Sequence, residues 1–266
     1  VQRNTRCGNN TGGACFYRNC HHQKISDAHN SKIQKYIIIS GLLFGVAAGL
    51  KLTACIYAPG AAITVAAMNG RFKQRFSRII IFSVAWAAAF LLLWGPWGLN
   101  LYKLTGNPFF PFFNFIFHSS WIPASGGGMD LRFMPKNTIE AIFYPFYWAN
   151  NPQMTVMEPR FADPRFAIAL GLALIALFVH SPQLLRFATQ REFKSISLSP
   201  QGAVLTFFSI SYIIWEKLFS ILRYAATLES ILGLIVLILS INILKALRIS
   251  PRMVAQAGIL VVVLIA

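Results

Sequence analysis

The stretch that decides the fold reads WGPWGLNLYKLTGNPFFPFFNFIFHSSWIP, from Trp94 to Pro123. Apolar segments of helix length lie on both sides of it, whereas the stretch itself combines prolines, which interrupt helices, with many phenylalanines. So many aromatic rings are unusual in a solvated linker, and an amphipathic segment of this kind lies in the interface between lipid and water. We therefore predict that residues 98–165 form a long extramembrane loop lying on a bilayer surface.

The composition of the whole chain is that of a membrane protein. Hydrophobic residues make up 56% of the 266 positions and charged residues only 12%, with a mean hydropathy of +0.55. A soluble domain has about 25% charged residues and lacks repeated apolar runs of helix length. The sequence predicts an all-α, polytopic transmembrane helical bundle, with about seven membrane segments in residues 36–266.

The first 35 residues differ from the rest. They are polar and basic and show neither a helical nor a strand period, so we expect a disordered or aberrant tail in residues 1–35. The chain ends inside an apolar run, residues 259–266, and we expect it to be a fragment of a longer protein. The tail contains side chains that zinc prefers, but no C-x2-C pair: Cys7, Cys15, Cys20, His21, His22 and His29.

The basic side chains predict the orientation. The net charge is +16, but Lys and Arg lie in short loops between apolar segments and form no basic stripe with interleaved aromatics, so we predict no nucleic-acid partner. Cytoplasmic loops of membrane proteins collect Lys and Arg. Residues 69–78, 181–199 and 245–252 are basic and should lie inside, whereas the long loop has nearly balanced charge and should lie outside.

Residues 36–67 form one apolar run that is interrupted by Lys51. A single helix of this length would exceed the ~20 residues that cross a bilayer, so we predict a tight helical pair that turns at residues 49–53. A charge at mid-bilayer costs about 2.5–3.5 kcal/mol on insertion scales. Lys51 either faces an anionic lipid phosphate or extends from a helix end to the interface, and both alternatives remain open.

Acidic and basic side chains pair along the long loop. A carboxylate can accept a proton from a hydroxyl group or hold a divalent cation such as Mg²⁺ or Mn²⁺, and an arginine can bind phosphate oxygens through two parallel hydrogen bonds. The alternative is a set of local ion pairs within turns. The candidate carboxylates are Asp130, Glu158 and Asp163, and the candidate phosphate-binding residues are Arg132, Arg160 and Arg165. Glu216, Lys217, Arg223, Tyr224 and Glu229 form a second polar group near the outer ends of the later spans.

Four segments carry a resemblance: GLLFGVAAGLKLTA (residues 41–54), TGNPFFPFFNFIFHSSWIP (105–123), DLRFMP (130–135) and the pair Arg223-Tyr224. Together they resemble bacterial membrane glycosyltransferases of the GT-C superfamily, the enzymes related to protein O-mannosyltransferases and aminoarabinose transferases. The resemblance implies transfer of a sugar from a polyprenyl-phosphate carrier to a lipid, glycan or protein acceptor on the outer face of the bacterial cytoplasmic membrane. Membrane lipid and the polyprenyl-phosphate donor would be the partners.

The resemblance also implies roles for the candidate residues. In such enzymes the catalytic acidic residue usually follows the first span, in a region that would precede Tyr36 here. Asp130, Glu158 and Asp163 would then support catalysis, and the chain would be inactive alone. The residues implied to bind substrate are Lys51, Arg132, Arg160, Arg165, Arg223 and Tyr224. Two other functions remain open: a transporter or lipid flippase, which would bind its substrate between broken helices, and a non-catalytic membrane assembly protein.

Overall fold

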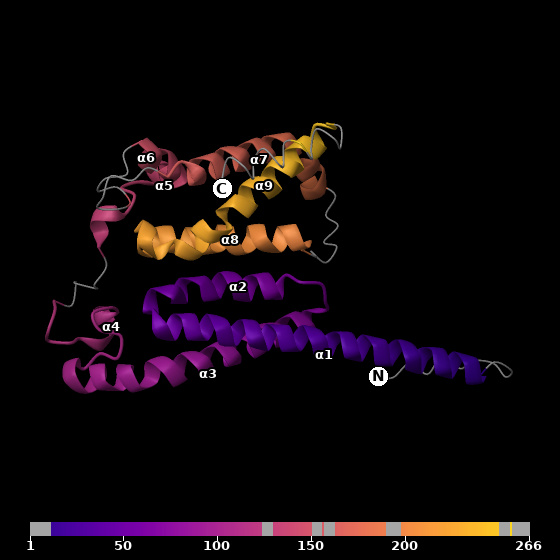
Figure 1. The fold of residues 1–266 in the computed structure, drawn as a ribbon, viewed down its shortest axis with the longest axis horizontal. Coiled ribbons are helices and arrows are strands. Elements are labelled where there is room, and N and C mark those ends of the chain that lie inside the picture. Colours follow the sequence, from indigo (N-terminus) through magenta and orange to yellow (C-terminus); the bar gives the residue numbers. More distant parts are fainter. Residues whose placement is uncertain are drawn as a thin grey trace.

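The computed structural model describes residues 12–123, 130–150, 156, 163–189, 198–249 and 256. This part of the chain is helical and contains no strand, which confirms the predicted all-α class. Figure 1 shows two layers of long helices, with short helices at one end.

The first layer contains α1 (Gly12–Leu50), the 3-10 helix η1 (Leu52–Ile56), α2 (Tyr57–Ala66) and α3 (Phe72–Thr105). The short elements are α4 (Asn114–Phe117), η2 (Leu131–Phe133), α5 (Thr138–Ile142) and α6 (Tyr144–Asn150). The second layer contains α7 (Arg165–Thr189), α8 (Pro200–Leu218), η3 (Leu222–Tyr224) and α9 (Ala226–Ala246).

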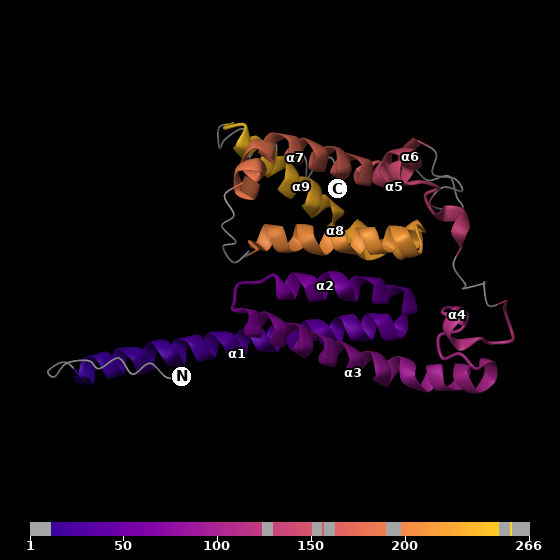
Figure 2. The ribbon, with the colours of Figure 1, turned by 180° about the vertical axis from the view of Figure 1, so that it is seen from behind.

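The predicted helical pair is present. Helix α1 ends at Leu50, Lys51 adopts an extended conformation (φ −142°, ψ 105°), and the chain reverses through η1 into α2. The two helices run antiparallel in both views (Figures 1 and 2). The turn therefore lies where the length of the apolar run predicts it. Lys51 occupies the turn because a charged residue at a helix end can reach water, while one inside a span cannot.

Glycines allow α1 to lie very close to α3. A Cβ atom on Gly41 would come within 2.6 Å of the Phe82 carbonyl oxygen, and one on Gly45 within 2.3 Å of the Trp86 carbonyl oxygen. Small residues of this kind let two helix backbones approach in a membrane. The two layers meet where α2 packs against α8, and there a Cβ on Gly60 would lie 2.4 Å from Ser211 Oγ.

The two ends of the bundle differ in a way that agrees with the predicted alternation of the chain. At one end, the Leu198 backbone N–H donates to the Ala67 carbonyl at 3.3 Å, which brings together two segments predicted to lie inside. At the other end, the Tyr57 hydroxyl donates to the Tyr224 carbonyl. We name the first the basic end and the second the loop end, where η1, η3 and the short helices α4 to α6 lie (Figure 1).

Three helices in the described part are long and apolar enough to cross a membrane: Ser31–Leu50, Phe72–Thr105 and Ala226–Ala246. Two shorter apolar helices, Leu52–Ala66 and Arg165–Ser181, accompany them. The chain is thus a helical membrane protein by the length and composition of these helices. Which side of the membrane the loop end faces stays a prediction, as does the total of about seven segments.

Two boundaries differ from the sequence-based prediction. Residues 12–35, expected to form part of a disordered tail, belong to α1, because a helix already formed by the apolar residues that follow extends at little further cost. Helix α3 does not end at Trp97; it continues past Pro96 to Thr105, so the predicted outer loop 98–165 begins with helix. Gly106, with φ +75°, ends the helix in the left-handed conformation that glycine adopts easily.

Candidate functional site

Two cations meet at one tyrosine ring at the loop end. Lys51 Nζ lies 5.2 Å from the centroid of the Tyr224 ring, and the Arg223 guanidinium carbon lies 5.2 Å from the same centroid. Both distances are within the range in which a cation is attracted to an aromatic face. Together with Tyr57, whose hydroxyl holds the Tyr224 carbonyl, these residues form what we call the Tyr224 cluster: Lys51, Tyr57, Arg223 and Tyr224.

Tight turns position the residues of the cluster. Lys51 follows α1 directly, and its carbonyl accepts a hydrogen bond from the Ala54 N–H at 2.8 Å. On the other side, Ser220 has φ +51°, and its N–H donates to the Trp215 carbonyl at 3.0 Å. The Trp215 indole N–H donates to the Ile221 carbonyl at 2.9 Å, so a buried side chain fixes the path of the chain just before η3.

The predicted substrate-binding residues Lys51, Arg223 and Tyr224 are therefore brought together, although they come from distant parts of the sequence. Tyr57 is a member of the cluster that sequence reasoning missed, because a tyrosine in an apolar run carries no signal of its partner. The cluster has positive charge: Lys51 and Arg223 are both exposed, and no Asp or Glu occurs from position 28 to position 129.

Two carboxylates of the described residues interact electrostatically with the cluster: Glu229 with Tyr57, and Asp130 with Arg223. Hydrogen bonds from Arg132, and to a smaller degree the positive charge of Arg223, hold the pKa of the Asp130 carboxyl below its ordinary value. Asp130 therefore stays ionised at neutral pH and somewhat below it. This places the turn that contains η2 within electrostatic range of η3.

Asp130–Arg132 and Asp163–Arg165 form the same structure twice. In each, the arginine Nε donates to one carboxylate oxygen and Nη2 to the other, at 2.8 and 2.6 Å in the first pair and 2.9 and 2.8 Å in the second. In each, the arginine backbone N–H also donates to the aspartate. These are the local turn ion pairs that the sequence left open as an alternative, and the geometry leaves each carboxylate bonded to arginine through both oxygens.

The two pairs differ in burial. The side chains of Asp130 and Arg132 are 30% and 62% exposed, whereas those of Asp163 and Arg165 are 5% and 37% exposed. What both arrangements can do chemically is hold a guanidinium in a fixed orientation. Glu158 and Arg160, the other predicted site residues of the loop, lie outside the described residues.

A divalent cation site does not form among the described residues. No three His, Cys, Asp or Glu side chains in this part of the chain gather as metal ligands would, and Asp130 and Asp163 are bonded to arginines. The Cys and His side chains of the tail, considered above as zinc ligands, lie outside the described side chains.

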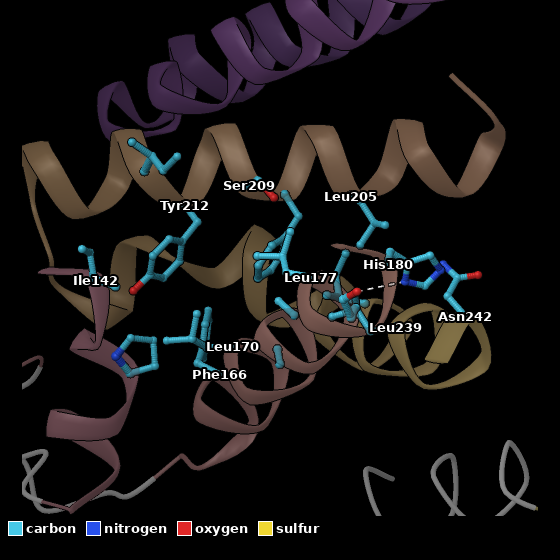
Figure 3. Close-up of a pocket in the computed structure, with 17 residues that line it drawn as sticks. Ile142, Phe166, Leu170, Leu177, His180, Leu205, Ser209, Tyr212, Leu239 and Asn242 are labelled. Atoms are coloured by element: carbon cyan, nitrogen blue, oxygen red, sulfur yellow. Dashed lines mark hydrogen bonds between the residues drawn. The ribbon is translucent and has the colours of Figure 1, made fainter. Parts of the chain in front are cut away.

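An apolar groove of about 590 Å³ lies among α7, α8 and α9. Tyr212 and Ile142 lie at one end of it, and His180 and Asn242 at the other (Figure 3). Phe166 lines the Tyr212 end and directly follows Arg165, so this end of the groove adjoins the Asp163–Arg165 pair. From Phe166 to His180 the helix rises roughly 21 Å, which exceeds half of the ~30 Å hydrocarbon core of a bilayer.

A buried carboxylate stands beside the groove. Tyr212 lines the groove, and its hydroxyl donates to Glu216 Oε1 at 3.2 Å, one helical turn further along α8. Glu216 is buried: only 5% of its surface is exposed. The sequence places Glu216 in the second polar group, near the outer ends of the later spans, and does not identify its partner. The spacing of four residues between Tyr212 and Glu216 was the available signal that they share a helix face.

Comparisons with protein families, with curated proteins and with solved structures find no match to this chain.

Proposed function

We propose that this chain is a membrane glycosyltransferase that transfers a sugar from a polyprenyl-phosphate carrier to an acceptor hydroxyl on the outer face of the bacterial cytoplasmic membrane. The observation that carries the proposal is the Tyr224 cluster, in which Lys51 and Arg223 lie over one ring at the loop end. The apolar groove reaches toward the same end of the bundle. A cationic site near an apolar groove suits a lipid with an anionic head.

In this proposal the donor binds by its two unlike parts. Arg223 binds phosphate oxygens through its planar set of N–H groups, and Lys51 adds a second positive charge. The Tyr224 ring keeps both cations near one another, so that their side chains lose less freedom when the phosphate arrives. The apolar tail lies along the groove between Phe166 and His180, where it is removed from water.

The transfer breaks the bond between the anomeric carbon of the sugar and the phosphate oxygen. The phosphate leaves with the electron pair, and Lys51 and Arg223 stabilise the negative charge that develops on it. The acceptor oxygen bonds to the anomeric carbon and gives its proton to a base. Asp130 and Asp163 are bonded to arginines in the structure, so in the proposal they orient Arg132 and Arg165 and are not the principal base.

The proposal is tested with the protein in lipid nanodiscs, a radiolabelled sugar on a polyprenyl-phosphate carrier, and membrane extract as the acceptor source. Arg223→Ala should lower the rate of transfer about tenfold or more, since a hydrogen bond to a charged group contributes about 1.5–3 kcal/mol. Lys51→Gln should lower it by a smaller factor. Lys103→Gln, which removes an exposed charge near the end of α3, is the matched control and should keep the wild-type rate.

Two results would contradict the proposal at different levels. Transfer from no polyprenyl-phosphate donor would exclude the class of enzyme, and wild-type rates in both Arg223→Ala and Lys51→Gln would exclude the Tyr224 cluster as the phosphate site. A flippase would instead move the labelled lipid between leaflets of sealed vesicles without transfer, and this is measured on the same preparation.

A further inference from the structure

A polar crevice lies between α1 and α3 at the basic end, at the opposite end of the bundle from the Tyr224 cluster. It has a volume of about 210 Å³. The side chains that make it polar are Gln34 of α1 and Lys73, Gln74, Ser77 and Arg78 of α3. Each of these groups can donate a hydrogen bond, two of them carry positive charge, and no carboxylate lines the crevice.

The hydrogen bonds already made in the structure orient these donors. Gln74 Oε1 accepts a bond from the Arg71 backbone N–H at 2.9 Å, so its amide N–H groups are directed elsewhere. Arg78 is only 7% exposed, and its Nη1 donates to the Asn69 carbonyl at 2.7 Å and to the Met68 carbonyl at 3.3 Å. These carbonyls are neutral, so they satisfy N–H groups of Arg78 without neutralising its charge.

No carboxylate of the described residues lines the crevice to neutralise this charge. In the first layer, Asp27 of α1 lies two helical turns before Gln34, and residues 28–129 contain no Asp or Glu. A buried charge is costly unless an opposite charge lies near it. The crevice is therefore built for an anion from outside the chain, and its donors suit the oxygens of a phosphate group.

The surroundings of the crevice identify the kind of anion. Ile33 and Ile81 line it together with the polar groups, and the surface beyond them is apolar: Tyr36, Phe76 and Ile80 are exposed on α1 and α3. Both helices are long and apolar enough to span a membrane. A phosphate that enters the crevice from the bilayer brings acyl chains that can lie on this apolar surface.

We infer that the crevice between α1 and α3 binds the phosphate headgroup of an anionic phospholipid. Lys73 and Arg78 supply the charge, and Gln34, Gln74 and Ser77 supply neutral donors. The lipid covers the seam at which the glycines of α1 contact α3, so it stabilises the pairing of these two helices. This inference does not depend on sugar transfer, because the crevice and the Tyr224 cluster lie at opposite ends of the bundle.

The test measures the thermal unfolding temperature of the protein in phosphatidylcholine nanodiscs as the fraction of phosphatidylglycerol is raised. The wild type should become more stable and reach a plateau. Lys73→Gln should require about fivefold more phosphatidylglycerol for half of the effect, since one basic side chain near an anionic surface contributes about 1 kcal/mol. Lys73 is exposed, so this substitution leaves the packing intact. Arg78 is unsuitable as the variant because it also holds the turn before α3.

Lys103→Gln is the matched control, since it makes the same change in charge at the other end of the same helix. It should behave as the wild type. An equal shift in Lys73→Gln and Lys103→Gln would overturn the inference, because it would mean that only the total charge matters. Inorganic phosphate added to pure phosphatidylcholine nanodiscs should give no stabilisation; a rise equal to that with phosphatidylglycerol would assign the crevice to free phosphate and overturn the lipid assignment.

Discussion

The Tyr57 hydroxyl donates a hydrogen bond to the main-chain carbonyl of Tyr224, a residue 167 positions further along the chain. Tyr57 begins α2 in the first layer, and Tyr224 ends η3 in the second. This contact brings Lys51, at the turn before η1, to the face of the Tyr224 ring. The candidate phosphate site thus depends on how the two layers meet at the loop end.

Tyr57→Phe should weaken this junction while keeping the shape of the side chain. The lost hydrogen bond should lower the free energy of unfolding by about 1 kcal/mol. It should also weaken binding of a long-chain alkyl phosphate, because η3 is then less firmly held beside Lys51. The measurements are thermal unfolding in detergent and alkyl phosphate affinity by calorimetry.

Tyr102→Phe is the control for this substitution, since Tyr102 is exposed on α3 and its hydroxyl makes no hydrogen bond to another described residue. Equal behaviour of the two variants in both measurements would show that the junction does not organise the site.

The glycines of α1 give a second prediction. Gly45→Ala places a Cβ atom 2.3 Å from the Trp86 carbonyl oxygen, which belongs to the backbone of α3 and cannot move aside cheaply. We expect a loss of about 1–3 kcal/mol in the free energy of unfolding, as for overpacking in a core. Gly95→Ala, in α3, meets nothing within 4 Å and should be neutral or slightly stabilising. Thermal unfolding temperatures of the two variants test this, and a tolerated Gly45→Ala would contradict the close contact of α1 with α3.

The features predicted correctly from sequence are those that depend on neighbouring residues. The turn at Lys51 follows from the length of an apolar run, and the alternation of basic and loop ends follows from charge along the chain. The ion pairs of Asp130 with Arg132 and of Asp163 with Arg165 span only two residues each, so a turn motif is sufficient to suggest them.

Other features depend on contacts between distant elements or on helix extension, and the sequence pattern does not contain them. Neither the contact of Tyr57 with Tyr224 nor the groove among α7, α8 and α9 leaves a periodic signal. The continuation of α3 past Pro96 depends on the helix tolerating a lost hydrogen bond, which membrane helices do more readily than soluble ones.

The two Asp-x-Arg pairs allow a matched comparison of burial. Asp163→Asn removes the charge from a side chain that is 5% exposed and leaves Arg165 with the weaker attraction of Glu229 in place of its ion pair. Because the arginine is partly exposed, we expect a loss of about 1–3 kcal/mol, less than for a fully buried pair. Asp130→Asn, with the same local hydrogen bonds but more exposed side chains, should leave the unfolding temperature nearly unchanged. Unfolding temperatures in the same detergent check both, and equal losses would mean that burial does not distinguish the pairs.

Glu216 gives a prediction that separates charge from hydrogen bonding beside the groove. Its carboxylate is buried and accepts one hydrogen bond, from Tyr212, within the described part of the chain. Glu216→Gln keeps an oxygen that can accept this bond and removes a charge that is costly to hold away from water, so the unfolding temperature should rise or stay the same. Glu216→Ala leaves the Tyr212 hydroxyl without its acceptor and opens a cavity, and it should lose about 1–3 kcal/mol. If Glu216→Gln were as destabilising as Glu216→Ala, the negative charge itself would be needed for the fold, and Lys217, whose positive charge acts on Glu216, would be its partner. If Glu216→Gln is instead the more stable protein, the retention of a destabilising carboxylate at the edge of the groove argues that it contacts the bound molecule.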